Sequence, residues 1–134
     1  MGEHEAVPHW AIFPCSGMMS SVGTLTAVAS MEAMRRVNPS QAGLFCTAAL
    51  AVDIPKHRKT TEAAARILAI DGCANRCASK VVERSGAGAG HFRELNLLKD
   101  LGIPKRGPFK PFDYTDSELT KAVGAIVAIC EDSA

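Results

Sequence analysis

Short apolar runs alternate along the chain with stretches in which apolar residues recur at helical spacing. The first run, WAIF, is stopped by Pro14, and the run that begins at Arg66 is stopped by Asp71 and Gly72. Such runs predict buried strands, and there are four of them, at residues 10–13, 43–46, 66–70 and 91–95. Helical spacing and capping residues predict helices at 21–37, from Thr60 or Thr61 to Ala65, at 73–84, and after Thr115 through Cys130.

Two of these helices have clear end signals. Ser20 or Ser21 can cap the helix at 21–37, and Thr115 with Glu118 forms a capping box for the last helix. Strands that alternate with helices form parallel sheets. The pattern therefore predicts an α/β fold: a single-domain, three-layer sandwich with a mostly parallel, Rossmann-like sheet of about four strands.

The length of the chain predicts one domain. A chain of 134 residues is close to the common size of a single domain, and 47% hydrophobic residues are enough for one core. Residues 1–8 are polar and include Pro8, so we expect a flexible leader there and one domain over 9–134.

Charge and hydropathy limit the kinds of partner and the cellular compartment that we expect for this protein. Lys and Arg total 15 and Asp and Glu total 14, so there is no strong signal for nucleic acid. The longest apolar segments are much shorter than the roughly 20 residues that span a bilayer, and the acidic N-terminus is unlike a signal peptide. We expect a cytoplasmic protein whose five cysteines are reduced.

Four of the cysteines stand where an apolar run ends or just beyond it. These are Cys15, Cys46, Cys73 and Cys77. The carboxyl ends of parallel strands lie at one edge of a sheet, so the four thiols are expected to meet there. If one helix runs through Cys73 and Cys77, their sulfurs lie one turn apart on the same face. The pattern predicts a metal or redox centre, whereas Cys130 falls on the apolar face of the last helix and is expected in the core.

Other residues near these cysteines are candidates for supporting roles. A strand-to-helix turn can stabilise a thiolate, which makes Cys15 and Cys73 candidate reactive thiols. Lys56 and His57 lie in the KHRK segment, which we expect to be a loop. Lys56 can offset the charge of bound thiolates and His57 can replace one as ligand, or both can simply be solvated. Asp71 can hold its own turn or orient a ligand.

Several of these motifs resemble those of the DGC-domain family. The segments PCSG-x-x-S-x-G and IDGC-x3-CA-x-K, a single cysteine in the middle strand, and KDLGI at residues 99–103 carry the resemblance, which runs from about Phe13 to Gly102. Members of that family are regarded as zinc-binding proteins with four chelating cysteines. The resemblance implies that Cys15, Cys46, Cys73 and Cys77 are those ligands here; it implies no particular activity. Met18, Met19 and Cys130 depart from the family pattern.

The leading hypothesis is a zinc-binding protein that holds one ion through the four cysteines. An iron–sulfur cluster is an alternative cofactor, because iron and zinc compete for the same thiolates. A thiol redox or sulfur-handling protein that uses Cys15 or Cys73 is the alternative function. No general base or nucleophile triad accompanies the cysteines, which favours a binding protein over an enzyme. Besides the metal ion, a protein partner or a second copy of the chain is left open.

Overall fold

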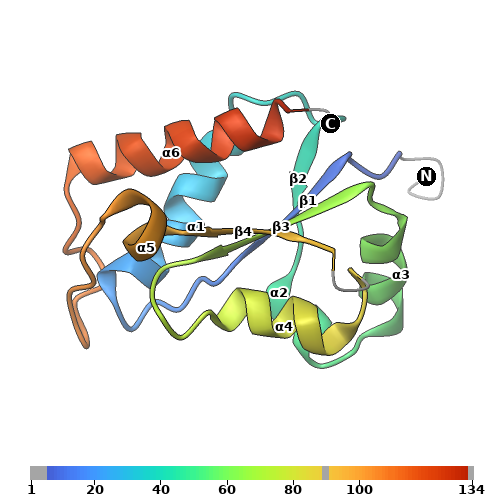
Figure 1. The fold of residues 1–134 in the computed structure, drawn as a ribbon, viewed down its shortest axis with the longest axis horizontal. Helices are drawn as coiled ribbons and strands as arrows, with labels where there is room; N and C mark the ends of the chain where they lie inside the picture. Colours follow the sequence, from blue (N-terminus) through green and yellow to red (C-terminus); the bar gives the residue numbers. More distant parts are fainter. Residues whose placement is uncertain (1–5, 89–90, 133–134) are drawn as a thin grey trace.

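Four parallel strands form one sheet, and helices cover both of its faces (Figure 1). The computed structural model describes residues 6–88 and 91–132. The strands are β1 (Trp10–Pro14), β2 (Ala42–Leu44), β3 (Arg66–Asp71) and β4 (Arg93–Asn96), and they lie in the order β2-β1-β3-β4. Every neighbouring pair is parallel, so the carboxyl ends of all four strands share one edge.

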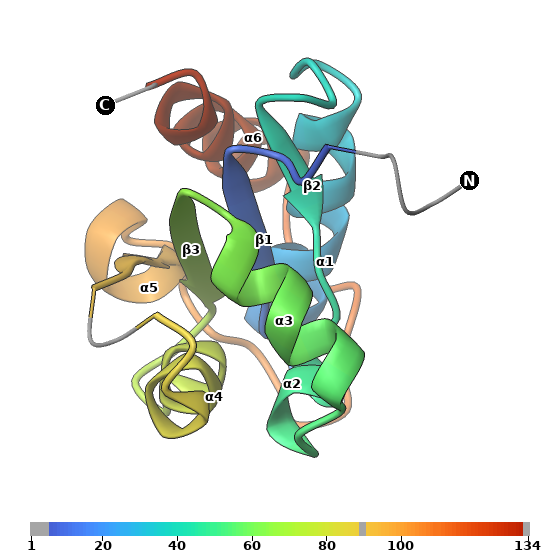
Figure 2. The same cartoon turned by 90° about the vertical axis from the view of Figure 1, so that its right-hand side faces the viewer.

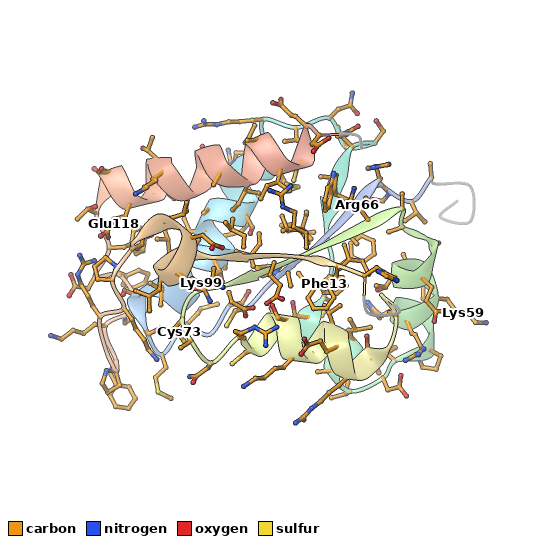
Figure 3. The ribbon with its side chains drawn as sticks, in the orientation of Figure 1. Phe13, Lys59, Arg66, Cys73, Lys99 and Glu118 are labelled. Atoms are coloured by element: carbon orange, nitrogen blue, oxygen red, sulfur yellow. The ribbon has the colours of Figure 1, made fainter. Side chains whose placement is uncertain are left out.

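The two central strands, β1 and β3, are apolar along almost their whole length. Every residue of β1 is buried, and in β3 only Arg66 is partly exposed. Such continuous apolar runs are typical of parallel strands that are covered on both faces. The Arg66 guanidinium lies 4.6 Å from the centroid of the Trp10 ring, at the amino ends of these strands (Figure 3).

Helices form the two outer layers, which confirms the predicted α/β sandwich. One face carries α1 (Ser21–Met34), α5 (Leu97–Leu101) and α6 (Asp116–Cys130), and the other carries α2 (Thr47–Ala51), α3 (Pro55–Ala63) and α4 (Cys77–Ser85) (Figures 1 and 2). Successive residues of β1 point to opposite faces. Trp10 and Ile12 join the core under α1 and α6, whereas Ala11 and Phe13 join the core under α2 and α4.

The chain after Cys46 is helical, and α3 includes the KHRK segment, for which we predicted a loop. The strand β2 ends at Leu44, and the Cys46 sulfur accepts a hydrogen bond of 3.4 Å from the Ala49 amide at the start of α2. The predicted caps Thr60 and Thr61 lie inside α3. Their hydroxyls donate to backbone carbonyls one turn earlier, at 2.9 and 2.7 Å, so they do not begin the helix.

The helix predicted from Cys73 begins only at Cys77. Arg76 has a φ of +53°, a left-handed conformation that a right-handed helix cannot contain. Its guanidinium donates to Glu94 at 2.8 Å and to Glu83 at 3.2 Å, and both bonds raise the pKa of Arg76. These contacts hold the turn that precedes α4.

The ends of α1 and α6 carry the predicted caps. Ser20 accepts a hydrogen bond of 3.2 Å from the Gly23 amide at the start of α1, which ends at Met34, three residues earlier than predicted. Thr115 and Glu118 form the capping box of α6. Glu118 also accepts two hydrogen bonds from Arg106, at 2.8 and 3.0 Å, which hold its pKa below the ordinary range.

The predicted leader, residues 1–8, falls mostly outside the described residues. Of its described part, Pro8 lies against Gly43 of β2, where an added Cβ would be 2.9 Å from the proline ring. Within residues 6–88 and 91–132, no helix has both the length and the apolar character needed to cross a bilayer.

Candidate metal centre

The structure places the four predicted ligand residues along the carboxyl edge of the sheet. Cys15 follows β1 directly, Cys46 comes two residues after β2, Cys73 comes two residues after β3, and Cys77 is the first residue of α4. Cys46 and Cys77 are exposed, and Cys15 and Cys73 are partly buried. Figure 3 labels Cys73 at this edge, beyond the end of β3. Segments as far apart in sequence as Cys15 and Cys77 therefore meet at one edge.

Two cavities at this edge are lined by overlapping sets of these cysteines. The larger cavity, of about 920 Å³, is lined in part by Cys15, Cys46 and Cys77. The smaller cavity, of about 440 Å³, is lined in part by Cys15, Cys73 and Cys77. Cys15 and Cys77 thus form the boundary between the two cavities, with Cys46 on one side and Cys73 on the other.

The sulfurs surround this boundary without forming a closed ligand set. In the described part of the chain, no three His, Cys, Asp or Glu side chains are grouped so as to hold a metal ion. The donor type is suitable, because four thiolates are a common structural zinc set. The residues therefore fit zinc in their chemistry, and the sulfurs would have to move together to bind it.

Cys73 and Cys77 do not share one helix, so the condition under which their sulfurs would lie on the same helix face is not met. Cys73 lies in the turn between β3 and α4, because the left-handed Arg76 delays the start of the helix. The Cys73 carbonyl accepts a hydrogen bond of 3.2 Å from the Arg76 amide. The two sulfurs consequently belong to different elements, a turn and a helix end.

The environment of Cys15 is different from the one predicted. Its amide donates to the Ile70 carbonyl at 2.8 Å, which ties the turn to β3. The helix α1 starts only at Ser21, so Cys15 is not at a helix N-terminus. Burial raises the pKa of the Cys15 thiol from 9.0 to about 11, a change that a hydrogen bond with Gly17 partly opposes. The predicted activation of Cys15 as a free thiolate is therefore not found.

We expect the metal-free thiols to differ sharply in reactivity. A pKa of about 11 leaves Cys15 roughly a hundredfold less ionised near pH 8 than an unshifted thiol, and the thiolate is the form that reacts. Cys130, fully buried with its pKa also raised to about 11, is expected to react just as slowly. Timed iodoacetamide labelling with peptide mass spectrometry should find the exposed Cys46 and Cys77 labelled first. Labelling of Cys15 as fast as Cys46 would contradict this description.

Asp71 connects the end of β3 to the start of α4. Its side chain is 2% exposed and accepts three hydrogen bonds: from the Ala78 amide at 2.7 Å, and from the Ser79 amide and hydroxyl at 3.1 and 2.6 Å. These amides lie seven and eight residues away and not in the turn of Asp71 itself. The carboxyl group therefore positions the first turn of α4, which carries Cys77.

The two other predicted supporting residues, Lys56 and His57, line the larger cavity. Both are exposed and lie in the first turn of α3, and not in a loop as predicted. They face the same cavity as Cys15, Cys46 and Cys77. This location is compatible with the predicted roles, which stay predictions.

Sequence reasoning missed two residues that contact Cys73. The Lys105 ammonium is 3.7 Å from the Cys73 sulfur, and the Asn96 side chain donates to the Cys73 carbonyl at 2.9 Å. Asn96 also caps α5 through the amides of Leu98 and Lys99. An asparagine before LLKDL is a recognisable cap signal, but no local pattern relates Lys105 to a cysteine 32 residues earlier.

Comparison with known proteins supports the family resemblance noted above. The family model described as the DGC domain matches residues 11–126, which includes all four cysteines and most of α6. No curated protein and no solved structure gives a significant match. Because the match covers most of the 134 residues, the chain belongs to the DGC-domain family.

Proposed function

We propose that this protein binds one zinc ion through Cys15, Cys46, Cys73 and Cys77. The observation that supports the proposal is the position of these thiols around two adjoining cavities at the carboxyl edge of the sheet. Cys15 and Cys77 line both cavities, so an ion between them is within reach of Cys46 from one side and Cys73 from the other. A bound zinc ion would link three strand ends and the start of α4.

Closure of the ligand set requires movement that the local structure permits. Cys46 is exposed at the start of the five-residue helix α2, and Cys73 lies in a turn. Hydrogen bonds fix the backbone near Cys15, at the Cys73 carbonyl and in the first turn of α4 near Cys77, so the movement required of Cys73 is that of its side chain. We therefore expect Cys46 and Cys73 to move toward Cys15 and Cys77 when the metal binds.

Nearby cations support binding of a divalent ion by four thiolates. Such a centre carries a net charge of about minus two, which needs donors or cations around it. Lys105 already contacts Cys73 at 3.7 Å, and Lys56 faces the larger cavity. The metal would displace the proton that burial holds on Cys15, since thiolates are the binding form. An iron–sulfur cluster in place of zinc would use the same thiols.

A thiol redox or sulfur-handling role is the second candidate, and one observation favours it. An ammonium group beside a sulfur assists thiolate chemistry, and Lys105 supplies one to Cys73. In this reading Cys73 is the attacking thiol, in preference to Cys15, whose pKa is raised by burial. Both candidates use reduced cysteines, so the proposal includes a cytoplasmic location.

Metal content of the purified protein tests the proposal. The chain is purified anaerobically without affinity metal or chelator and measured by native mass spectrometry with elemental analysis. The proposal predicts one zinc per chain, held through a wash with a weak chelator. Iron with inorganic sulfide would assign a cluster to the same thiols. A chain that stays metal-free when offered zinc and iron, and that has one fast-reacting thiol at Cys73, would support the thiol role instead.

A further inference from the structure

Four large apolar side chains lie exposed on two loops next to the cysteine edge. Met18 and Met19 belong to the loop before α1 and are 61% and 62% exposed, and Phe109 and Phe112 belong to the loop between α5 and α6 and are 80% and 79% exposed. Together they are called the apolar surface below. In Figure 1 the orange segment that carries Phe109 and Phe112 runs beside the blue start of α1.

Backbone hydrogen bonds hold the two loops together. The Phe109 amide donates to the Met19 carbonyl at 2.7 Å, and the Ser21 amide donates to the Arg106 carbonyl at 2.9 Å. The Arg106 amide donates to the Ser21 hydroxyl at 2.8 Å, and the Arg106 guanidinium donates to the Glu118 carboxylate. The backbone that carries Met19 and Phe109 is therefore held in one arrangement, which lowers the entropy that a partner must overcome on binding.

We propose that the apolar surface is the interface with a second copy of this chain. Its four side chains offer an apolar area on the order of 500 Å², since an aromatic side chain alone contributes roughly 150–250 Å². A specific interface buries about 800 Å² on each partner, and the polar rim around the four side chains can supply the difference.

The charges around the apolar surface favour a second copy over a lipid surface. Lys105 and Lys110 lie on one loop with Asp113, and Asp116 begins α6 just beyond; all four are exposed. In a dimer with a two-fold axis, the same surface of each copy faces the other. A rim that carries both positive and negative charges can then pair its lysines with the aspartates of the other copy. The two aspartates offset the attraction of the two lysines to an anionic membrane, so this rim gives no net electrostatic preference for one. A net charge of +1 also leaves little repulsion between two copies.

A dimer formed in this way would cover part of the candidate metal centre. Met19 and Gly107 line the smaller cavity together with Cys73 and Cys77. The second copy would therefore lie beside the mouth of that cavity and limit access to Cys73. This inference does not depend on metal binding, because the loops and their hydrogen bonds are part of the metal-free chain.

Sedimentation velocity of the full chain with chelator present tests the interface. We expect a concentration-dependent dimer, and we expect the double variant Phe109→Ser, Phe112→Ser to weaken dimerisation at least roughly tenfold. Val52→Ser is the matched control, because Val52 is 70% exposed but lies at the end of α2, away from the two loops. This control should dimerise like the parent chain, and circular dichroism should show all three proteins folded.

Three results would overturn the inference. One is a parent chain that stays monomeric at all concentrations. Another is a dimer that the double variant forms as tightly as the parent does. The third is a monomer that co-sediments with vesicles of phosphatidylglycerol and phosphatidylcholine, which would assign the apolar surface to lipid. Because chelator is present throughout, none of these results bears on the zinc proposal.

Discussion

Replacing Cys15 by serine is expected to weaken zinc binding by more than about a hundredfold. Cys15 and Cys77 each line both cavities, so we place their two sulfurs at the centre of the proposed ligand set. Loss of a direct ligand should cost more than loss of an outer-shell partner, which alone lowers metal affinity about 10- to 100-fold. Competition with a zinc-binding dye at fixed pH measures the dissociation constant.

Cys130→Ala is the control for this variant. Cys130 is fully buried on α6, in the core on the opposite face from α2 and α4, and it has no place in the proposed ligand set. We expect Cys130→Ala to bind zinc as the parent does and to lose only some stability. Equal zinc affinity of Cys15→Ser and the parent chain would remove Cys15 from the centre.

Replacing Asp71 by alanine is expected to destabilise the metal-free fold by about 2–4 kcal/mol. The change removes three hydrogen bonds and leaves the buried Ala78 and Ser79 amides without their acceptor, and each such loss costs about 1–3 kcal/mol. The destabilisation should also affect zinc binding, because the same bonds hold the first turn of α4 and hence Cys77. Urea unfolding at neutral pH with chelator present measures the loss of stability.

A milder variant tests whether the Asp71 carboxylate contributes more stability than its single hydrogen bond with the Ser79 hydroxyl. Ser79→Ala removes only the hydroxyl donor at 2.6 Å and keeps both amide bonds to Asp71, so we expect a loss of about 0.5–1.5 kcal/mol. If Asp71→Ala were no less stable than Ser79→Ala, Asp71 would not be the connection between β3 and α4 that the geometry indicates.

The parts of the fold that could be predicted are those with local signals. The run WAIF predicts β1 because a buried parallel strand needs continuous apolar residues, and Thr115 with Glu118 predicts the start of α6 because both halves of the capping box are visible. Placement of the cysteines after the strands also follows from the order of strands and turns. These signals lie within a few residues of the element that they define.

The errors arise where distant contacts or unusual backbone decide the structure. A helix from Cys73 is plausible from the spacing of residues, but Arg76 adopts a left-handed conformation beside Glu83 and Glu94, and the sequence carries no glycine there to indicate it. Cys46 caps α2 although cysteine is not a usual capping residue. The contact between Lys105 and Cys73 depends on how the loop after α5 returns to the sheet edge.

The same limit applies to the candidate site. Sequence position predicts which cysteines share an edge, but it gives neither the two cavities nor the distances between the sulfurs. Burial raises the pKa of Cys15, which is the reverse of the predicted direction, and residues 16–20 separate Cys15 from α1. The proposed movement of Cys46 and Cys73 is the step that connects the metal-free structure to a four-sulfur centre.

X-ray absorption spectroscopy at the zinc edge can identify the atoms that bind the ion in the proposed four-sulfur centre. The measurement is made on the parent chain loaded with one equivalent of zinc, and it reports the number and type of atoms bound to the ion. We expect four sulfur ligands at about 2.3 Å and no nitrogen or oxygen ligand. A zinc ion bound mainly by nitrogen and oxygen, or by fewer than three sulfurs, would contradict this expectation.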